Sequence, residues 1–99
     1  MNKIEIVQVR LFDLKDGELV IDAFHRTLRN PPAFRARLYQ SCTVENDWLI
    51  IFGESNTNDI KSKSTEAIFL IESLRQIGLV NHALWMLAQE EYDDGPDQL

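Results

Sequence analysis

The 99-residue sequence predicts one α+β domain with its elements in the order βαββαβ. Four segments have the alternation or the β-branched and aromatic content of strands, and two segments repeat apolar residues with the period of a helix. Hydrophobic residues make up 44% of the chain, which is enough for one folded core. This element order is that of ferredoxin-like folds, which have a four-stranded antiparallel sheet with two helices on one face.

Residues 4–12 predict the first strand, because Ile and Val residues alternate there with Gln and Arg. A helix is expected over residues 17–29, where apolar residues recur at helical spacing after a capping Asp16. Pro31 and Pro32 end this helix, because proline lacks a backbone donor and restricts the residue before it.

Residues 34–44 and 48–52 predict the second and third strands, joined as a hairpin by a three-residue turn. We expect Val44 to pair with Trp48, which sets the side of the sheet on which each residue lies. One side then carries Trp48, Ile50 and Phe52, and the other carries Leu49, Ile51, Gly53, Arg37 and Tyr39.

A second helix is expected over residues 64–77, where apolar residues stand at i, i+3, i+4 and i+7. Gly78 would end it in the left-handed C′ position. Residues 82–90 return to alternation and predict the last strand. We therefore expect a folded domain over residues 1–92 and a mobile acidic tail over residues 93–99.

The formal net charge of −6 belongs mostly to the C-terminal end of the chain. Five of the 16 acidic residues lie among the last ten residues, which contain no base, leaving 11 acids and 10 bases in the rest. A nearly neutral body lacks the basic surface that nucleic-acid binders need, so no nucleic-acid partner is expected.

The one cysteine, Cys42, cannot form an intrachain disulfide. It lies within an alternating apolar pattern, so we expect a small buried thiol there. A lone reduced cysteine favours a reducing, cytoplasmic compartment. No stretch approaches the roughly 18 apolar residues of a membrane span, so no membrane partner is expected.

Both sides of the third and last predicted strands carry large apolar residues. The two helices can cover only one face of the sheet, so the other face needs a cover. A second copy of the same sheet is the simplest cover, which predicts a homodimer formed through the sheet face.

At this point the chain resembles the dimeric α/β-barrel superfamily, especially the small antibiotic-biosynthesis-monooxygenase-like (ABM-like) domains. The resemblance covers about residues 3–91 and rests on a first strand Ile4–Val9, a hairpin Arg37–Phe52, a helix Ser64–Ile77 and a last strand His82–Leu87. It implies two sheets packed face to face as a barrel in a dimer, often with a small-molecule cavity between sheet and helices. Family members include cofactor-free oxygenases of polycyclic aromatics and haem-degrading enzymes.

The cofactor-free oxygenases have Trp, Asn, Tyr or Arg residues around a cavity that can bind and deprotonate a phenolic substrate. Residues of matching type here are Trp85, Trp48, Tyr39, Arg37, Arg10 and His82. We take His82, Tyr39 and Trp85 as catalytic candidates, and Arg10, Arg37 and Gln8 as substrate-binding candidates, with Gln8 added as a polar residue on a strand expected to be central. Haem-degrading members present an axial histidine on the second helix, and residues 64–77 contain none, so no haem cofactor is expected. No Cys/His cluster has zinc-ligand spacing, so no metal is expected either.

Packing explains several candidates as well as chemistry does. Trp85 suits a core or interface, Arg37 a salt bridge, and His82 the surface after a helix end. Gln8 and Arg10 on a central strand suit hydrogen bonds between subunits.

Two hypotheses for the function follow. The leading hypothesis is a homodimeric, cofactor-independent monooxygenase-like enzyme acting on a small aromatic or polyketide-like molecule. The alternative is a non-enzymatic dimeric module that binds a small ligand or a partner. A cavity of several hundred Å³ between sheet and helices, lined by converging polar groups, would favour the enzyme.

Overall fold

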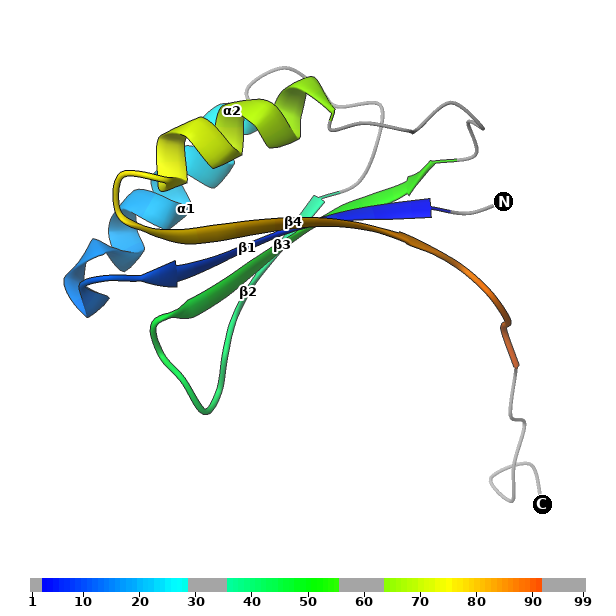
Figure 1. Cartoon of the computed structure of the whole chain (residues 1–99), viewed down its shortest axis with the longest axis horizontal. Coiled ribbons are helices and arrows are strands. Elements are labelled where there is room, and N and C mark those ends of the chain that lie inside the picture. The colour runs from blue at the N-terminus through cyan, green and yellow to red at the C-terminus, as the bar shows by residue number, and fades with distance from the viewer. Residues whose placement is uncertain (1–2, 29–35, 56–63, 92–99) are drawn as a thin grey trace.

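The computed structural model describes residues 3–28, 36–55 and 64–91, which form one antiparallel sheet with two helices on one of its faces (Figure 1). The strands are β1 (Lys3–Leu11), β2 (Ala36–Gln40), β3 (Asp47–Ser55) and β4 (Gly78–Met86), and the helical elements are η1 (Leu14–Asp16), α1 (Gly17–Thr27) and α2 (Thr65–Leu74). The strand order is β2-β3-β1-β4. The predicted ferredoxin-like α+β fold is therefore confirmed.

The central strand β1 has two very different sides. Val7, Val9 and Leu11 are at most 2% exposed and pack with the helices, whereas Gln8 and Arg10 between them are exposed. We call the first the helix side of the sheet and the second its open side. The helix side contributes to a core completed by Val20, Ala23, Ile50, Phe52, Ala67, Leu70, Ile71 and Leu74.

The two helices begin at different kinds of cap. Ser64 caps α2, because its Oγ accepts a hydrogen bond from the Ala67 backbone N–H at 3.1 Å. The predicted cap at Asp16 is wrong, since its side chain makes no capping hydrogen bond to α1. Asp13 instead caps the short helix η1 by accepting from the Lys15 N–H at 3.1 Å. The prolines predicted to end α1 lie outside the described residues.

The predicted hairpin register is wrong by four residues. Gln40, rather than Val44, pairs with Trp48. Strand β2 ends early because the Ser41 hydroxyl accepts hydrogen bonds from the backbone N–H groups of Thr43 and Val44, which turns the chain out of the sheet. A shift of four is even, so the predicted sides of the hairpin are nevertheless correct.

The loop after β2 also contains Cys42, which is exposed. The prediction of a buried thiol is therefore wrong, for the same reason as the register: Cys42 lies beyond the end of β2 and not inside it.

Gly78 opens strand β4 and does not end helix α2 in a left-handed conformation. Helix α2 already stops at Leu74, and Gly78 pairs with Leu11. A Cβ built on Gly78 would lie 2.5 Å from the carbonyl oxygen of Arg10, so glycine permits the close approach of β1 and β4. Strand β4 consequently starts four residues earlier than predicted.

Strand β4 ends at Met86, which pairs with Lys3 at the start of β1. Residues 87–91 continue away from the sheet as an extended segment (Figure 1). The predicted domain end at residue 92 and the predicted acidic tail lie outside the described residues. Among the described residues, no helix is long and apolar enough to cross a membrane.

Candidate functional site

The six predicted site residues divide between the two sides of the sheet. The strand pairing places Gln8, Arg10, Arg37, Tyr39 and Trp85 on the open side. His82 lies opposite Val7 and therefore on the helix side. The structure does not bring the catalytic candidates Tyr39, Trp85 and His82 together.

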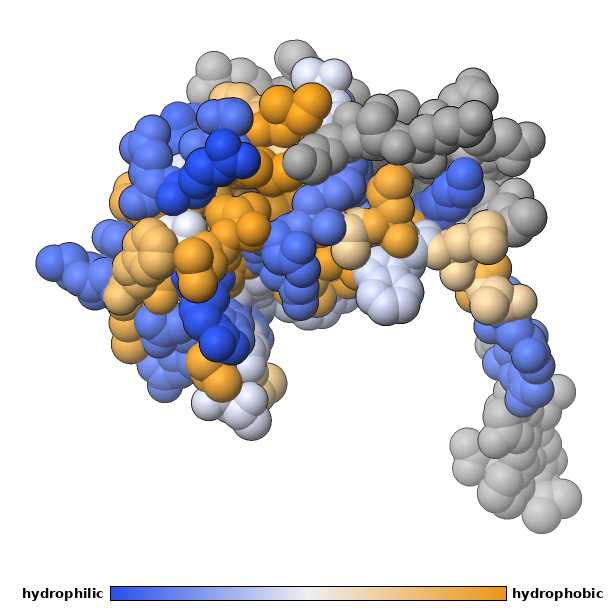
Figure 2. All heavy atoms as spheres, in the orientation of Figure 1, coloured by the Kyte–Doolittle hydropathy of each residue, from blue (hydrophilic) through white to orange (hydrophobic). Residues whose placement is uncertain are grey.

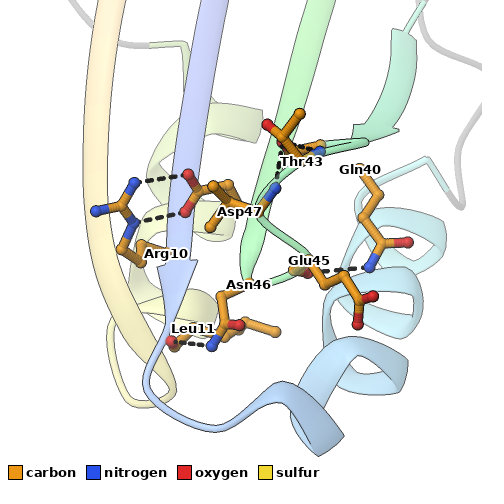
Figure 3. Close-up of polar contacts among 9 residues, drawn as sticks. Arg10, Leu11, Gln40, Thr43, Glu45, Asn46 and Asp47 are labelled. Atoms are coloured by element: carbon orange, nitrogen blue, oxygen red, sulfur yellow. Dashed lines mark hydrogen bonds and ion pairs between the residues drawn. The ribbon is translucent and has the colours of Figure 1, made fainter.

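On the open side, Arg10 and Asp47 form a two-pronged ion pair between neighbouring strands. Nε of Arg10 donates to Oδ1 of Asp47 at 2.6 Å, and Nη2 donates to Oδ2 at 2.7 Å (Figure 3). The two residues stand directly opposite each other on β1 and β3. This hydrogen bonding to Arg10 lowers the pKa of the Asp47 carboxyl, and the pKa of Arg10 is raised by the same contact.

A hollow of about 290 Å³ lies beside this ion pair. Its lining includes the polar side chains of Gln8, Arg10, Asp47 and Asn81, which belong to the open side. This hollow is therefore not the cavity between sheet and helices that would favour an enzyme. It is a surface depression suited to a ligand or to a partner's side chains.

On the helix side, a second polar group is buried around Glu5. Glu5 is 6% exposed and is the one buried polar or charged residue among those that the structure describes. Nε2 of His82 lies 2.7 Å from its Oε2. The Ser64 backbone N–H donates to Oε2 at 2.9 Å, and the Ser64 hydroxyl donates to Oε1 at 2.5 Å. Three elements thus meet at one carboxylate: β1, β4 and the start of α2.

The predicted surface location of His82 is wrong. Its side chain is only 13% exposed, because β4 starts early enough to carry it into the middle of the strand. An ionised carboxylate only accepts hydrogen bonds, so opposite an ionised Glu5 the proton of this contact belongs to Nε2 of His82. The other ring nitrogen, Nδ1, is then left with a free lone pair that can accept a proton.

Within the described part of the chain, the one hydrogen bond of the His82 ring is the contact of Nε2 with Glu5. The His82 side chain is 13% exposed, so the ring is not fully enclosed. A histidine held by a carboxylate on one nitrogen, with the other nitrogen unpaired, is the arrangement of a general base.

Ser64 is not placed to act as a nucleophile. Its hydroxyl donates to Glu5 and accepts from the Ala67 N–H, so it is engaged on both sides. The carboxylate stands between the serine and the histidine, whereas nucleophilic catalysis needs the histidine next to the serine. The chemistry that this cluster supports is therefore proton transfer at His82.

Glu5 and Ser64 were not among the predicted site residues. One signal in the sequence could have found Glu5, since it is an acid in the alternating positions otherwise filled by Val7, Val9 and Leu11. Such an acid is buried with the core and must find donors. Nothing local identifies those donors, because Ser64 and His82 lie 59 and 77 residues further along the chain.

Comparison with solved structures identifies the fold. SnoaB, a cofactor-independent oxygenase from Streptomyces nogalater, superposes in a variant form with a TM-score of 0.64 at 15% identity, covering 90% of this chain and 95% of its own. A protein from Nitrosomonas europaea, named a putative antibiotic biosynthesis monooxygenase, gives 0.60 at 10% identity, over 88% and 99% of the two chains. Rv0793 from Mycobacterium tuberculosis gives 0.60 at 14% identity, over 93% and 100%.

No protein-family model and no curated protein sequence matches the chain. The structural likeness extends over nearly the whole of each chain, and at these identities it shows the fold. The chain therefore has the fold of ABM-like domains, as its resemblance to that group predicts.

Proposed function

We propose that this protein is a cofactor-independent monooxygenase-like enzyme that oxidises a small phenolic or polyketide-like aromatic, with His82 as its general base. The observation that carries the proposal is the contact of the buried Glu5 with the largely buried His82, whose Nδ1 makes no hydrogen bond within the described residues. The fold shared with a cofactor-independent oxygenase supports the same class of reaction.

The substrate class follows from what a single base can achieve. Nδ1 of His82 removes a proton from an aromatic methylene compound whose enol form is a phenol, and the resulting anion is a reductant for O₂. One electron passes to O₂, and the two radicals combine into a peroxide anion, which takes the proton back from His82. Loss of water from this hydroperoxide leaves a ketone, so that R₂CH₂ and O₂ become R₂C=O and H₂O.

Anthrone is a suitable probe, because its methylene carbon lies between two rings and opposite a carbonyl. Oxygen uptake and anthraquinone formation would be measured together, with protein-free buffer as the blank. The variant His82→Gln is expected to lose about 100-fold or more in rate, the usual contribution of a general base. The matched control is His25→Gln, which changes an exposed histidine on α1. Equal rates for the two variants would contradict the role of His82.

The proposal includes a homodimer formed through the open side of the sheet. Large apolar side chains lie uncovered there: Leu79 is 66% exposed, Trp85 60% and Tyr39 45%. Figure 2 shows a concave surface on this side, between the β2–β3 hairpin and the extended segment after β4. A second sheet placed against it would cover these residues.

Light scattering tests the dimer. At micromolar concentration we expect a mass near twice the 11.5 kDa of one chain. Ile51→Glu, at the open side of β3, should give single chains, whereas Ile68→Glu on the exposed side of α2 should not. A native mass near 11.5 kDa would remove the dimer from the proposal.

The hollow on the open side favours a second candidate function, a module that binds a small ligand without reacting with it. Its polar side chains and Leu79 offer both hydrogen bonds and apolar contact. Chemical-shift mapping with the aromatic probe separates the candidates. Shifts centred on Asn81 and Leu79 support the binding module, and shifts centred on His82 and Leu84 support the enzyme.

A further inference from the structure

The start of helix α2 is connected directly to the imidazole of His82 through one carboxylate. Ser64 supplies two donors to Glu5, from its backbone N–H at 2.9 Å and its hydroxyl at 2.5 Å. Nε2 of His82 lies 2.7 Å from the oxygen, Oε2, that also accepts the Ser64 N–H. The carboxylate is 7% exposed, so water does not compete freely for these contacts.

From this geometry we infer that Ser64 and Glu5 are positioning residues that set the orientation of His82, presenting its Nδ1 as the proton acceptor. The inference rests on the proposed function only for its effect on rate. The orientation itself can be measured without any substrate.

Two donors from one residue fix a carboxylate more firmly than one. The Ser64 N–H belongs to the backbone at the first turn of α2, and the hydroxyl is itself held by the Ala67 N–H at 3.1 Å. Both carboxylate oxygens are therefore tied to the helix, and rotation of the Glu5 side chain would break both bonds. Since Oε2 cannot turn away, the imidazole opposite it keeps Nε2–H pointing at Glu5 and Nδ1 pointing away.

The arrangement also makes the base dependent on how α2 is seated. Ser64 caps the helix and orients Glu5 with the same hydroxyl group, so a displaced helix start removes a donor from the carboxylate. At metal sites, the hydrogen-bond partners of the ligands commonly contribute 10- to 100-fold to affinity or activity. We expect an effect at the lower end of this range for Ser64, which acts on the imidazole through Glu5.

The first test is spectroscopic and uses the native protein. The chain has two histidines, so ¹⁵N–¹H correlation spectra with His25→Gln as the assignment control identify the His82 ring. We expect the neutral ring to carry its proton on Nε2, with a downfield, slowly exchanging N–H signal. A ring protonated on Nδ1, or an Nε2–H that exchanges at the rate of an exposed imidazole, overturns the inference whatever the variants do.

The second test separates positioning from helix capping. Ser64→Gly removes the hydroxyl but keeps the backbone N–H, and glycine caps helices almost as well as serine. We expect it to shift and broaden the Nε2–H signal and to lower kcat with anthrone about 10-fold, with KM nearly unchanged. Ser64→Thr keeps the hydroxyl and should restore both the signal and kcat.

The outcomes are distinct for the inference and for the proposed function. A folded Ser64→Gly protein with an unchanged Nε2–H signal overturns the positioning role. A changed signal that Ser64→Thr restores supports it, even if no variant affects oxidation of anthrone. Native-like rates in His82→Gln overturn the proposed function and leave the orientation of the ring as measured.

Discussion

On the helix side of β1, the side chains of Val7 and Val9 are at most 2% exposed, whereas Gln8 between them is exposed to solvent on the open side. Each side also holds one pair of oppositely chargeable groups. The His82–Glu5 side chains are 13% and 7% exposed, and the Arg10–Asp47 side chains are 63% and 31% exposed. The same type of contact therefore occurs in two very different environments, one largely shielded from water and one open to it.

This difference determines what each pair can do. In the dry pair a lost partner cannot be replaced by water, so Glu5 needs every donor it has. In the exposed pair water substitutes for a lost partner, and the contact adds little to stability. Glu5, whose hydrogen bonds are fixed in this way, is therefore suited to hold the His82 imidazole in place. The exposed pair of Arg10 and Asp47 is suited to contact a partner.

The largest expected effect comes from two adjacent residues of β3. Ile50 is fully buried on the helix side, so Ile50→Ala should lower the free energy of unfolding by about 4 kcal/mol through lost burial and a cavity. Ile51 lies on the open side, and Ile51→Ala should cost far less in dilute protein. Urea unfolding at several protein concentrations measures both. In a dimer the loss for Ile51→Ala grows with concentration while that for Ile50→Ala does not.

The second effect compares the two acids. Glu5→Ala leaves the Ser64 N–H and Nε2–H of His82 buried without an acceptor, which should cost about 3 kcal/mol in unfolding free energy. Asp47→Ala, which exposes its partner only to water, should cost much less. Chemical unfolding at neutral pH measures the difference. A Glu5→Ala protein as stable as Asp47→Ala would show that the buried contacts are not required for folding.

The third effect concerns the contact between β1 and β4. Gly78→Ala would place a Cβ 2.5 Å from the Arg10 carbonyl oxygen and 2.7 Å from Cγ2 of Val9, and a backbone atom cannot simply rotate away. We expect a loss of about 2 kcal/mol, as for other overpacked cores. Gly17→Ala is the control, because its nearest atom is a Trp48 side-chain carbon at 3.0 Å. Thermal unfolding of the two variants should show a clearly lower Tm for Gly78→Ala alone.

The side of the sheet on which each residue lies was largely predictable from the sequence. The alternation in β1 and in the hairpin assigns each residue to a side, and that assignment survives a register error of four because four is even. The same alternation already separates His82 from Trp85, three positions apart on β4, although both were expected at one site. The side that a residue faces depends on whether its position along the strand is odd or even, which can be read directly from the sequence.

The polar cluster was not predictable, because its geometry depends on contacts between distant segments. Glu5, Ser64 and His82 come together only when β4 pairs with β1 and α2 lies over them. Gly78 shows the same limit. Locally it resembles a helix end, but its pairing with Leu11 makes it the first residue of a strand. Long-range pairing decided both cases, and a single sequence contains no direct record of it.

The smallest expected effect is the pH dependence of the exposed pair. Its contact with Arg10 lowers the pKa of Asp47 below the ordinary 3.8, so the unfolded chain binds the proton more readily than the folded one. The contribution of the pair is therefore present above pH 3.8 and is lost as the pH falls through the lowered pKa. Carbon-detected NMR titration should show Asp47 titrating below its ordinary range in the native protein and returning toward it in Arg10→Gln. Both side chains are open to water, so Asp47→Asn should remove only a minor part of the loss of stability in acid. A large change would mean that the pair is covered in solution.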